Sequence, residues 1–298
     1  MYVVLGASGN TGSVVANNLL SRGHKVRAVG RSADRLKDLA SQGAEIAVAD
    51  LADAAALTRA FKGADSAYVL IPPDTTSQDP RAYQERVSDA IVSALKNAGV
   101  KNVVSLSSIG ADKSSGTGPV VGLFNLEQKL NQIDANVLHL RAGYFMENTL
   151  SQVGVIRTMG SVAGPLRPDL KLPMIATRDI GNAAADTLRG EIRGKQTREL
   201  LGQRDIDYVE VASIIGKAIG KPSLGYVHAP DDQLRAALVQ MGMSANFVGL
   251  LLEMAGALNS GYMRALEPRS AANTQPTSFD TFVEEEFAPA YKQQMAAA

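Results

Sequence analysis

Three glycines near the start of the sequence, Gly6, Gly9 and Gly12, have the spacing of a turn that binds phosphate groups. They follow the apolar, β-branched run of residues 1–5, which predicts a buried parallel strand, and they precede an apolar stripe at residues 14–20, which predicts a helix. Glycines in this order let the main chain approach a pyrophosphate, and the free amides at the start of the helix attract the anion. The order therefore predicts a dinucleotide site; the alternative is a glycine-rich turn that binds no ligand.

The spacing is Gly-x-x-Gly-x-x-Gly, and it resembles the turn of short-chain and extended short-chain dehydrogenases. A nucleoside triphosphate loop would need a lysine after its last glycine, and Ser13 stands there instead. The residues of the turn that we expect to hold the cofactor are Gly6, Ala7, Ser8, Gly9, Asn10, Thr11 and Gly12.

The second predicted strand covers residues 24–29. In dinucleotide folds, the turn after this strand contacts the adenosine ribose and distinguishes NAD from NADP. An NAD site usually has an acidic residue here, whereas this sequence has Arg31, with Arg27 and Arg35 nearby. Because arginine suits the 2′-phosphate of NADP, the sequence favours NADP(H) and leaves NAD(H) as the second choice. The alternative for Arg31 is a solvated loop charge.

Two more strand ends are expected beside the cofactor, because ligands of open parallel sheets collect at the carboxyl ends of the strands. Asp50 and Leu51 follow the third strand, and the Asp50 carboxylate would either accept a hydrogen bond from adenine or cap the next helix. The fourth strand, residues 66–71, ends with Ile71 and Pro72, which should border the cofactor.

Hydroxyl groups end the fifth predicted strand. Ser107 and Ser108 would contact the nicotinamide or a substrate carbonyl, or they simply close the strand. The polar, glycine-rich residues 112–119 that follow predict a mobile loop. His139 lies within the apolar sixth strand, 136–140, where we expect a hydrogen-bonded core residue rather than a ligand or a base.

The strands alternate with amphipathic helices along the first half of the chain, and this alternation predicts an α/β fold with helices on both faces of a parallel sheet. In this Rossmann-type, doubly wound sheet the strand order would be 3-2-1-4-5-6, with the ligand crevice between strands one and four.

A family resemblance extends beyond the glycine turn. Residues 140–148, Leu-Arg-Ala-Gly-Tyr-Phe-Met-Glu-Asn, are similar to a segment of the NmrA-like family, an atypical branch of the short-chain dehydrogenase superfamily. Residues 172–182 and 276–282 are also similar to segments of that family, and Arg31 and Asp50 fit its pattern. Together these segments cover nearly the whole chain.

The resemblance implies that the glycine turn and Arg31 hold NADP(H) or NAD(H), with Gly143, Tyr144 and Phe145 near the nicotinamide. It also implies a smaller, lid-like lobe built from the second half of the chain. Methionines in that half would line an adaptable pocket for a flat apolar substrate or fill the core. They are Met241, Met243, Met254 and Met263.

The expected division is a dinucleotide-binding domain at residues 1–150, to which residues 173–203 and 276–290 return. Residues 151–172 and 204–275 would form the smaller, mostly helical substrate lobe.

The proton-transfer pair of ordinary short-chain dehydrogenases, Tyr-x-x-x-Lys, is absent, because none of the eight tyrosines has a lysine four residues later. Reductases of the NmrA-like branch often carry Lys or His on the helix before the glutamate that is Glu127 here, and residues 121–126 contain neither. These departures disfavour a carbonyl reductase, and also an isomerase or epimerase of the extended branch.

Two functions remain open. One is an NADPH-dependent reductase of quinones, dyes or related conjugated acceptors, in which solvent supplies the proton because the product is a stabilised anion. The candidate polar contacts to the acceptor are Tyr144, Ser107 and Ser108. The other is a non-catalytic NAD(P)-binding redox sensor that acts through a regulatory protein partner.

The composition limits the partners. The net charge is zero and the pI is about 6.9, so nothing indicates a surface for nucleic acid or anionic membranes. Three histidines and no cysteine argue against a metal site. With a strand at Met1 and no apolar run near the roughly 20 residues of a membrane span, we expect a cytoplasmic protein. The sequence leaves a homodimer open.

Overall fold

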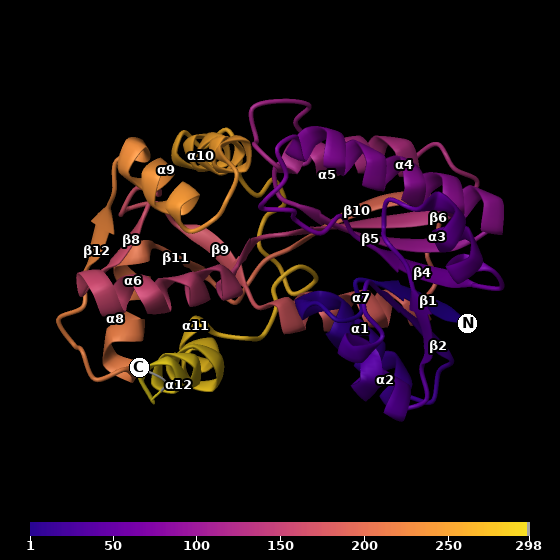
Figure 1. Cartoon of the computed structure of the whole chain (residues 1–298), viewed down its shortest axis with the longest axis horizontal. Coiled ribbons are helices and arrows are strands. Elements are labelled where there is room, and N and C mark those ends of the chain that lie inside the picture. The colour runs from indigo at the N-terminus through magenta and orange to yellow at the C-terminus, as the bar shows by residue number, and fades with distance from the viewer. Residues whose placement is uncertain (297–298) are drawn as a thin grey trace.

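The computed structural model describes residues 1–296 and has two lobes (Figure 1). The first lobe is built on a parallel sheet with the order β10-β6-β5-β4-β1-β2-β3. The predicted order of the first six strands is confirmed, and β10 adds to the β6 edge. The strands are β1 (Tyr2–Leu5), β2 (Val26–Gly30), β3 (Glu45–Val48), β4 (Ser66–Val69), β5 (Asn102–Ser108), β6 (Asn136–Ala142) and β10 (Lys195–Leu200).

Helices cover both faces of this sheet, because successive strand residues point to opposite sides. Val3 and Leu5 lie in one buried core, and Val4 between them lies in the other. The first core is covered by α3 (Ala54–Phe61), α4 (Pro80–Ala98) and α5 (Val120–Leu130). The second is covered by α1 (Asn10–Ser21), the short helices η1 (Asp34–Leu36) and α2 (Lys37–Ser41), and α7 (Thr177–Arg189). The doubly wound α/β fold is therefore confirmed.

The second lobe has its own core, which includes Val162, Met174, Ile215, Leu258 and Phe282. Its helical segments are η2 (Met146–Ser151), α6 (Gln152–Met159), α8 (Tyr208–Ala218), α9 (Asp231–Gln240), α10 (Ala245–Asn259), α11 (Phe279–Phe282), η3 (Val283–Phe287) and α12 (Ala288–Ala296).

Two small sheets in this lobe were not predicted from the sequence. In the first, β9 (Leu172–Ile175) lies between β7 (Tyr144–Phe145) and β11 (Asp205–Ile206). In the second, β8 (Val162–Gly164) pairs with β12 (Tyr226–His228). Their strands have only two to four residues, too few for an alternating pattern to be recognised.

The chain crosses between the lobes more than once. After β9 it enters α7 and β10 of the first lobe, and residues 265–278 later run back along β10. There the Leu201 amide donates to the Asn273 carbonyl at 2.7 Å, and the Gln275 amide donates to the Leu201 carbonyl at 2.8 Å. Within residues 1–296, no helix is long and apolar enough to cross a membrane.

Candidate functional site

The glycine turn joins β1 to α1 in a conformation that only glycine accommodates easily. Gly6 has a φ of +61°, and a Cβ added to Gly12 would lie 2.3 Å from the Gly6 carbonyl oxygen. The Gly9 amide donates to that same oxygen at 2.8 Å. The turn is therefore closed on itself, with helix and strand in direct backbone contact.

The start of α1 fits a phosphate group. Gly9 is its N-cap and provides no side-chain acceptor, and the first turn of the helix contains no acidic residue. The first amides of a helix need acceptors from outside it, and they carry the positive end of the helix dipole. An anion placed against these amides would meet no side chain in front of Gly9 and no negative charge in the turn.

Thr11 of the same turn has a structural bond. Its hydroxyl accepts a hydrogen bond from the Tyr68 hydroxyl at 2.9 Å, and both side chains are buried. Burial raises the pKa of Tyr68, so this hydroxyl stays a donor. The Thr11 hydroxyl oxygen thus has a partner inside the fold, and its own proton is left as a donor.

The three arginines near β2 differ in what they contact. Arg27 bonds Glu45 at 2.9 Å and the carbonyls of Ala60 and Lys62, so it ties β2 to its neighbours. Arg31 and Arg35 are exposed and have no ion pair within the described residues. Arg35 reaches the glycine turn, where its guanidinium lies 3.4 Å from the Ser8 carbonyl. Two guanidinium groups without a carboxylate partner thus remain for a phosphate.

Asp50 does not cap α3. Its carboxylate accepts from the Ala52 amide at 2.9 Å, and the cap is Asp53, which accepts from the Ala56 amide. The capping alternative is therefore wrong, because the chain makes one more turn before the helix starts. Leu51 is buried in the core beneath α3 and α4. The contact between Asp50 and adenine stays a prediction.

Tyr83, in the first turn of α4, was not singled out in the sequence. Its pKa is raised first by burial and then by Asp74 and Asp50, while Arg31 acts in the opposite direction. The phenol therefore lies within electrostatic range of Arg31 and Asp50, the two residues that the sequence assigned to the adenosine end. The sequence feature that could have indicated Tyr83 is its position as an aromatic residue early in the helix after β4.

β4 ends earlier than the sequence predicts, and the hydroxyls at the end of β5 have partners within the protein. Pairing along β4 stops at Val69, so Ile71 and Pro72 belong to the loop that follows and are half-buried. Ser107 is buried, and its hydroxyl donates to the Glu127 carboxylate at 2.6 Å. Ser108 donates to the Ile109 carbonyl.

The Ser107 bond belongs to a buried ion pair. Arg141 on β6 donates to both oxygens of Glu127, at 3.0 and 2.6 Å, and Glu127 is 2% exposed. Such a bidentate pair satisfies the buried carboxylate and fixes α5 on the sheet. The Ser107 hydroxyl is therefore engaged in holding the fold together. His139 is also buried, with its Nε2 atom 3.0 Å from the Asn131 side-chain oxygen, as expected for a core histidine.

The segment after β6 directs two aromatic rings to opposite sides. Phe145 packs against the core that contains α1 and α7, and Tyr144 packs against the core of the second lobe. The Tyr144 hydroxyl accepts from the Tyr208 hydroxyl at 3.4 Å, and burial raises the pKa of both phenols. A Cβ at Gly143 would lie 2.1 Å from the Pro173 carbonyl, so this glycine allows β7 to pair with β9.

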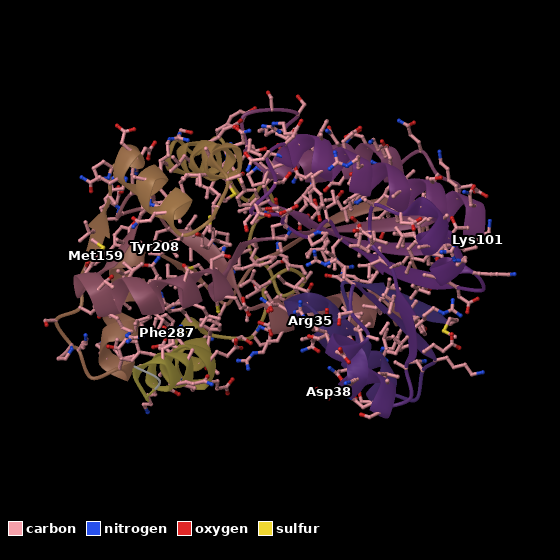
Figure 2. The ribbon with its side chains drawn as sticks, viewed as in Figure 1. Arg35, Asp38, Lys101, Met159, Tyr208 and Phe287 are labelled. Atoms are coloured by element: carbon pink, nitrogen blue, oxygen red, sulfur yellow. The ribbon has the colours of Figure 1, made fainter. Side chains whose placement is uncertain are left out.

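Figure 2 shows Tyr208 in the smaller lobe and Arg35 in the first lobe. The glycine turn and the loops that contain Arg31, Asp50 and Ile71 follow the carboxyl ends of β1, β2, β3 and β4. The three candidate catalytic hydroxyls do not converge on one point. Ser107 bonds Glu127, Ser108 bonds main chain, and Tyr144 bonds Tyr208. Their catalytic role stays a prediction.

Glu147 is a further buried group that the sequence did not single out. One carboxylate oxygen accepts from the amide and hydroxyl of Thr177, at 2.8 and 2.6 Å, where α7 begins. The other oxygen is buried and has no partner among the described residues. Burial raises the pKa of this carboxyl, against the Thr177 bonds.

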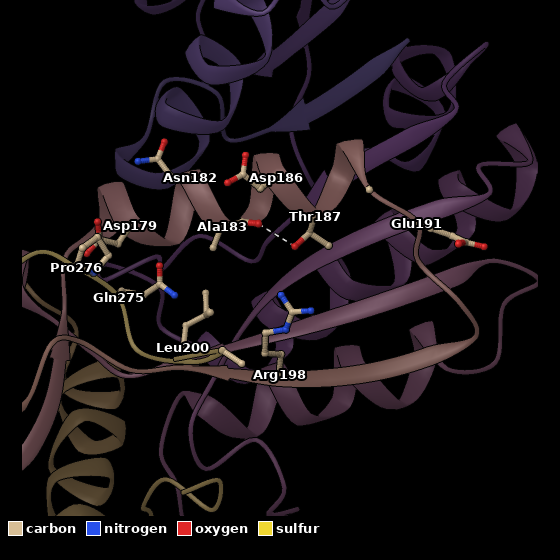
Figure 3. Close-up of a pocket in the computed structure, with 12 residues that line it drawn as sticks. Asp179, Asn182, Ala183, Asp186, Thr187, Glu191, Arg198, Leu200, Gln275 and Pro276 are labelled. Atoms are coloured by element: carbon tan, nitrogen blue, oxygen red, sulfur yellow. Dashed lines mark hydrogen bonds between the residues drawn. The ribbon is translucent and has the colours of Figure 1, made fainter. Parts of the chain in front are cut away.

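A cavity of about 550 Å³ lies elsewhere, between α7, β10 and residues 272–276 (Figure 3). Arg198 of β10 points into it, and Thr187 of α7 stands on the opposite wall. None of its lining residues comes from the glycine turn or from the ends of β2, β4 or β5. Among residues 1–296, no group of His, Cys, Asp or Glu could hold a metal ion.

Comparison with known proteins identifies relatives over nearly the full length. The model of the NmrA-like family matches residues 2–284. An NAD(P)H azoreductase from Xenophilus azovorans is 28% identical over 256 residues, which are 85% of this chain and 86% of that protein. Quinone oxidoreductase 2 from Escherichia coli K12 is 27% identical, over 93% of this chain and 95% of its own.

The fold is also that of a solved reductase. The crystal structure of an NADPH-dependent quinone oxidoreductase from Escherichia coli, complexed with NADPH, superposes with a TM-score of 0.79. The two chains are 24% identical, and the match covers 96% of this chain and all of the other.

Proposed function

Because the chain belongs to the NmrA-like family, we propose that it is an NAD(P)H-dependent reductase that transfers hydride to a quinone, a dye or a related conjugated acceptor. The observation that carries the proposal is the glycine turn, in which Gly12 abuts the Gly6 carbonyl and α1 begins without a side-chain cap. That turn leaves main-chain amides available for the pyrophosphate at the carboxyl edge of a parallel sheet.

The cofactor would be NADPH in preference to NADH. Arg31 and Arg35, both exposed and without an ion pair in the described structure, would bind the 2′-phosphate by charge-assisted hydrogen bonds. Asp50 and Tyr83 would lie beside the adenosine, and Ile71 and Pro72 would line the edge of the site. The NADPH-dependent quinone oxidoreductase from Escherichia coli, whose structure holds NADPH, supports this assignment.

The bound nicotinamide supplies the hydride, and this chain positions the acceptor against it. Leu123, Tyr144 and Met254 each lie half-buried against the second-lobe core, and apolar side chains of this kind would suit a flat ring. Met263, in contrast, is buried against Gly110 and fills the core, and Met241 is 67% exposed, so the four methionines do not line one pocket.

No proton donor is required from the protein in this reaction. A quinone that accepts hydride becomes a hydroquinone monoanion, which is stabilised by its ring and takes a proton from solvent. Binding, alignment and exclusion of water from the nicotinamide therefore supply the rate enhancement. This agrees with the missing Tyr-x-x-x-Lys pair.

The test is a titration of the purified chain with NADPH and NADH, followed by nicotinamide fluorescence, and then addition of menadione or an azo dye. The chain contains no tryptophan, so the nicotinamide signal is free of overlap from that source. We expect tighter binding of NADPH and protein-dependent oxidation by the acceptor.

A matched pair of variants identifies the binding site. In Gly12→Ala the new methyl group would overlap the Gly6 carbonyl, so NADPH binding and turnover should be lost. In Gly154→Ala, on α6, the methyl group meets nothing within 4 Å among the described residues, so both should be kept. Tight binding without turnover of any quinone or dye would instead support the redox sensor, and no binding by the wild type would refute both functions.

A further inference from the structure

The N-terminus of α10 is fastened to the loop that follows β4, although the two are about 170 residues apart in sequence. The Ser244 amide donates to the Thr75 carbonyl at 2.9 Å, and the Ser244 hydroxyl donates to the Ser77 carbonyl at 2.6 Å. The Asn246 amide group donates to the Gln78 carbonyl at 2.5 Å. Ser244 is 6% exposed, so these bonds are shielded from water.

The middle and the end of α10 meet the loop that follows β5. Gly118 has a φ of +57°, and a Cβ there would lie 2.0 Å from the Leu250 carbonyl oxygen. Just beyond the helix, the Tyr262 hydroxyl donates to the Ser115 carbonyl at 3.3 Å. Figure 1 shows α10 beside α9, on the side of the second lobe that faces α5. One helix of the second lobe therefore contacts the loops after two adjacent strands of the sheet.

We propose that Ser244 is a positioning residue that holds the acceptor side of the second lobe in register with the cofactor loop at residues 71–78. This inference rests on the proposed function. The loop begins with Ile71 and Pro72, predicted to border the cofactor, and it presents its carbonyls to α10. Met254, one of the half-buried residues offered to the acceptor, lies on the same helix. Ser244 thus connects the two substrates through a rigid element.

The physical reason is the steep distance dependence of hydride transfer. A displacement of about 1 Å between reacting groups can cost about a hundredfold in rate. Without the Ser244 hydroxyl donor, α10 keeps its contact with the loop after β5 but loses the side-chain bond to Ser77, one of its three bonds to the loop after β4. The helix can then pivot away from the nicotinamide side of the sheet.

The Ser244 hydroxyl has a second role that a test must separate from the first. It caps α10 by accepting from the Phe247 amide at 3.0 Å. Aspartate caps helices as well as serine does but has no proton to donate to the Ser77 carbonyl. Threonine preserves both roles. Ser244→Asp therefore removes the hydroxyl bond to the Ser77 carbonyl while it keeps the cap and the main-chain bond to Thr75, and Ser244→Thr is the conservative rescue.

The experiment compares the wild type, Ser244→Asp, Ser244→Thr and Asn246→Ala in three measurements. They are thermal unfolding, the NADPH dissociation constant from nicotinamide fluorescence, and kcat and KM for menadione. We expect Ser244→Asp to unfold at a somewhat lower temperature, because its carboxylate faces the Ser77 carbonyl, but to bind NADPH within threefold. At a temperature where every variant is folded, its kcat/KM for menadione should fall at least tenfold, further than in Asn246→Ala. Ser244→Thr should recover the loss, and Asn246→Ala should show a smaller one.

A Ser244→Asp variant with wild-type kcat/KM would overturn the proposal, and so would a loss that follows the unfolding temperature across all variants. Amide hydrogen exchange tests it independently of turnover. NADPH should slow exchange in residues 75–79 and in the first turn of α10 in the wild type, and only in residues 75–79 in Ser244→Asp. If the wild type binds NADPH but reduces nothing, the proposed reaction fails while this exchange result still decides the role of Ser244.

Discussion

At the scale of single residues, carboxylates removed from solvent fix the ends of secondary-structure elements. Glu199 on β10 accepts from the amides of Leu266 and Glu267, at 2.9 and 2.8 Å. Asp179 on α7 accepts from the amide and hydroxyl of Thr277, at 3.0 and 2.9 Å. Each carboxylate receives more than one hydrogen bond, which offsets the cost of burying its charge. These residues act on the fold, whereas Arg31 and Arg35 are free to act on a ligand.

The arginines give a prediction about cofactor choice. Replacing Arg31 or Arg35 by alanine should each weaken NADPH binding by about 10-fold to 100-fold, since charge-assisted hydrogen bonds contribute about 1.5–3 kcal/mol. NADH lacks the 2′-phosphate, so its dissociation constant should change less than twofold. Fluorescence titrations with both cofactors measure the effect, and Arg157→Ala, an exposed arginine on α6, is the control. Equal weakening for NADH would assign the arginines to the pyrophosphate instead.

Glu147 gives a prediction about pH. Burial raises its pKa in the folded state, so the folded chain binds this proton more tightly than the unfolded chain does. Its contribution to stability is present below the unfolded pKa of about 4.3 and is lost as the pH rises through the folded value. The unfolding free energy of wild type minus that of Glu147→Gln should therefore decrease as the pH rises from 4 to 7. Urea denaturation at several pH values measures the difference, and a constant difference would contradict the assignment.

At the scale of elements, glycines decide how closely loops approach helices. Residues 112–119 were expected to be mobile, yet several of them contact α10 and Tyr262, the residue that follows it closely. Gly116 lies against the Tyr262 ring, Gly118 lies against the α10 backbone, and Lys113 stands 5.6 Å above the Tyr262 ring. In contrast, α9 has no buried residue within the described chain. The loop after β5 is thus better anchored than one of the helices.

The contact at Gly118 gives a prediction about stability. Gly118→Ala should cost about 2–5 kcal/mol, because the new methyl group meets the Leu250 carbonyl and the positive φ adds strain. Gly256→Ala on the same helix has nothing within 4 Å in the described structure, and it should stabilise the chain by about 0.5–1 kcal/mol. Chemical denaturation compares the two, and similar stabilities would show that the loop does not press on α10.

At the scale of the whole molecule, the lobes are joined on two sides. The first junction is α10 with the loops after β4 and β5. The second is the return of residues 265–278 along β10 and α7, held by Glu199 and Asp179. Arg178 of α7 also pairs with Glu285 of η3. Because the two junctions involve different strands, the two lobes cannot separate from each other without breaking buried hydrogen bonds.

This arrangement predicts that the cofactor stabilises both lobes together. At a concentration one hundred times its dissociation constant, NADPH should raise the unfolding free energy by about 2.7 kcal/mol. Hydrogen exchange in β8, within the second lobe, should slow together with exchange in β1. Protection of β1 alone would mean that the lobes unfold independently, and Gly12→Ala should abolish the effect in both.

Much of the first lobe could be predicted because its pattern is local and repeated. The helix at residues 54–61 begins and ends as expected, and the strand order follows from the alternation of strands and helices. The second lobe was harder, since its strands are short and the residues that β9 pairs with β7 are 30 positions apart. His139 could be assigned to the core from its apolar neighbours, but its bond to Asn131 could not.

The sequence by itself determined the glycine turn, the parallel sheet behind it and the family to which the chain belongs, because these depend on residues close together in the chain. Only the tertiary structure decided which polar side chains are free. In the structure Ser107 bonds Glu127, Arg35 bonds the glycine turn, and Ser244 bonds the loop after β4. These contacts join residues from 20 to 167 positions apart. The local pattern of apolar and polar residues does not predict such pairs, because they form only when the elements pack.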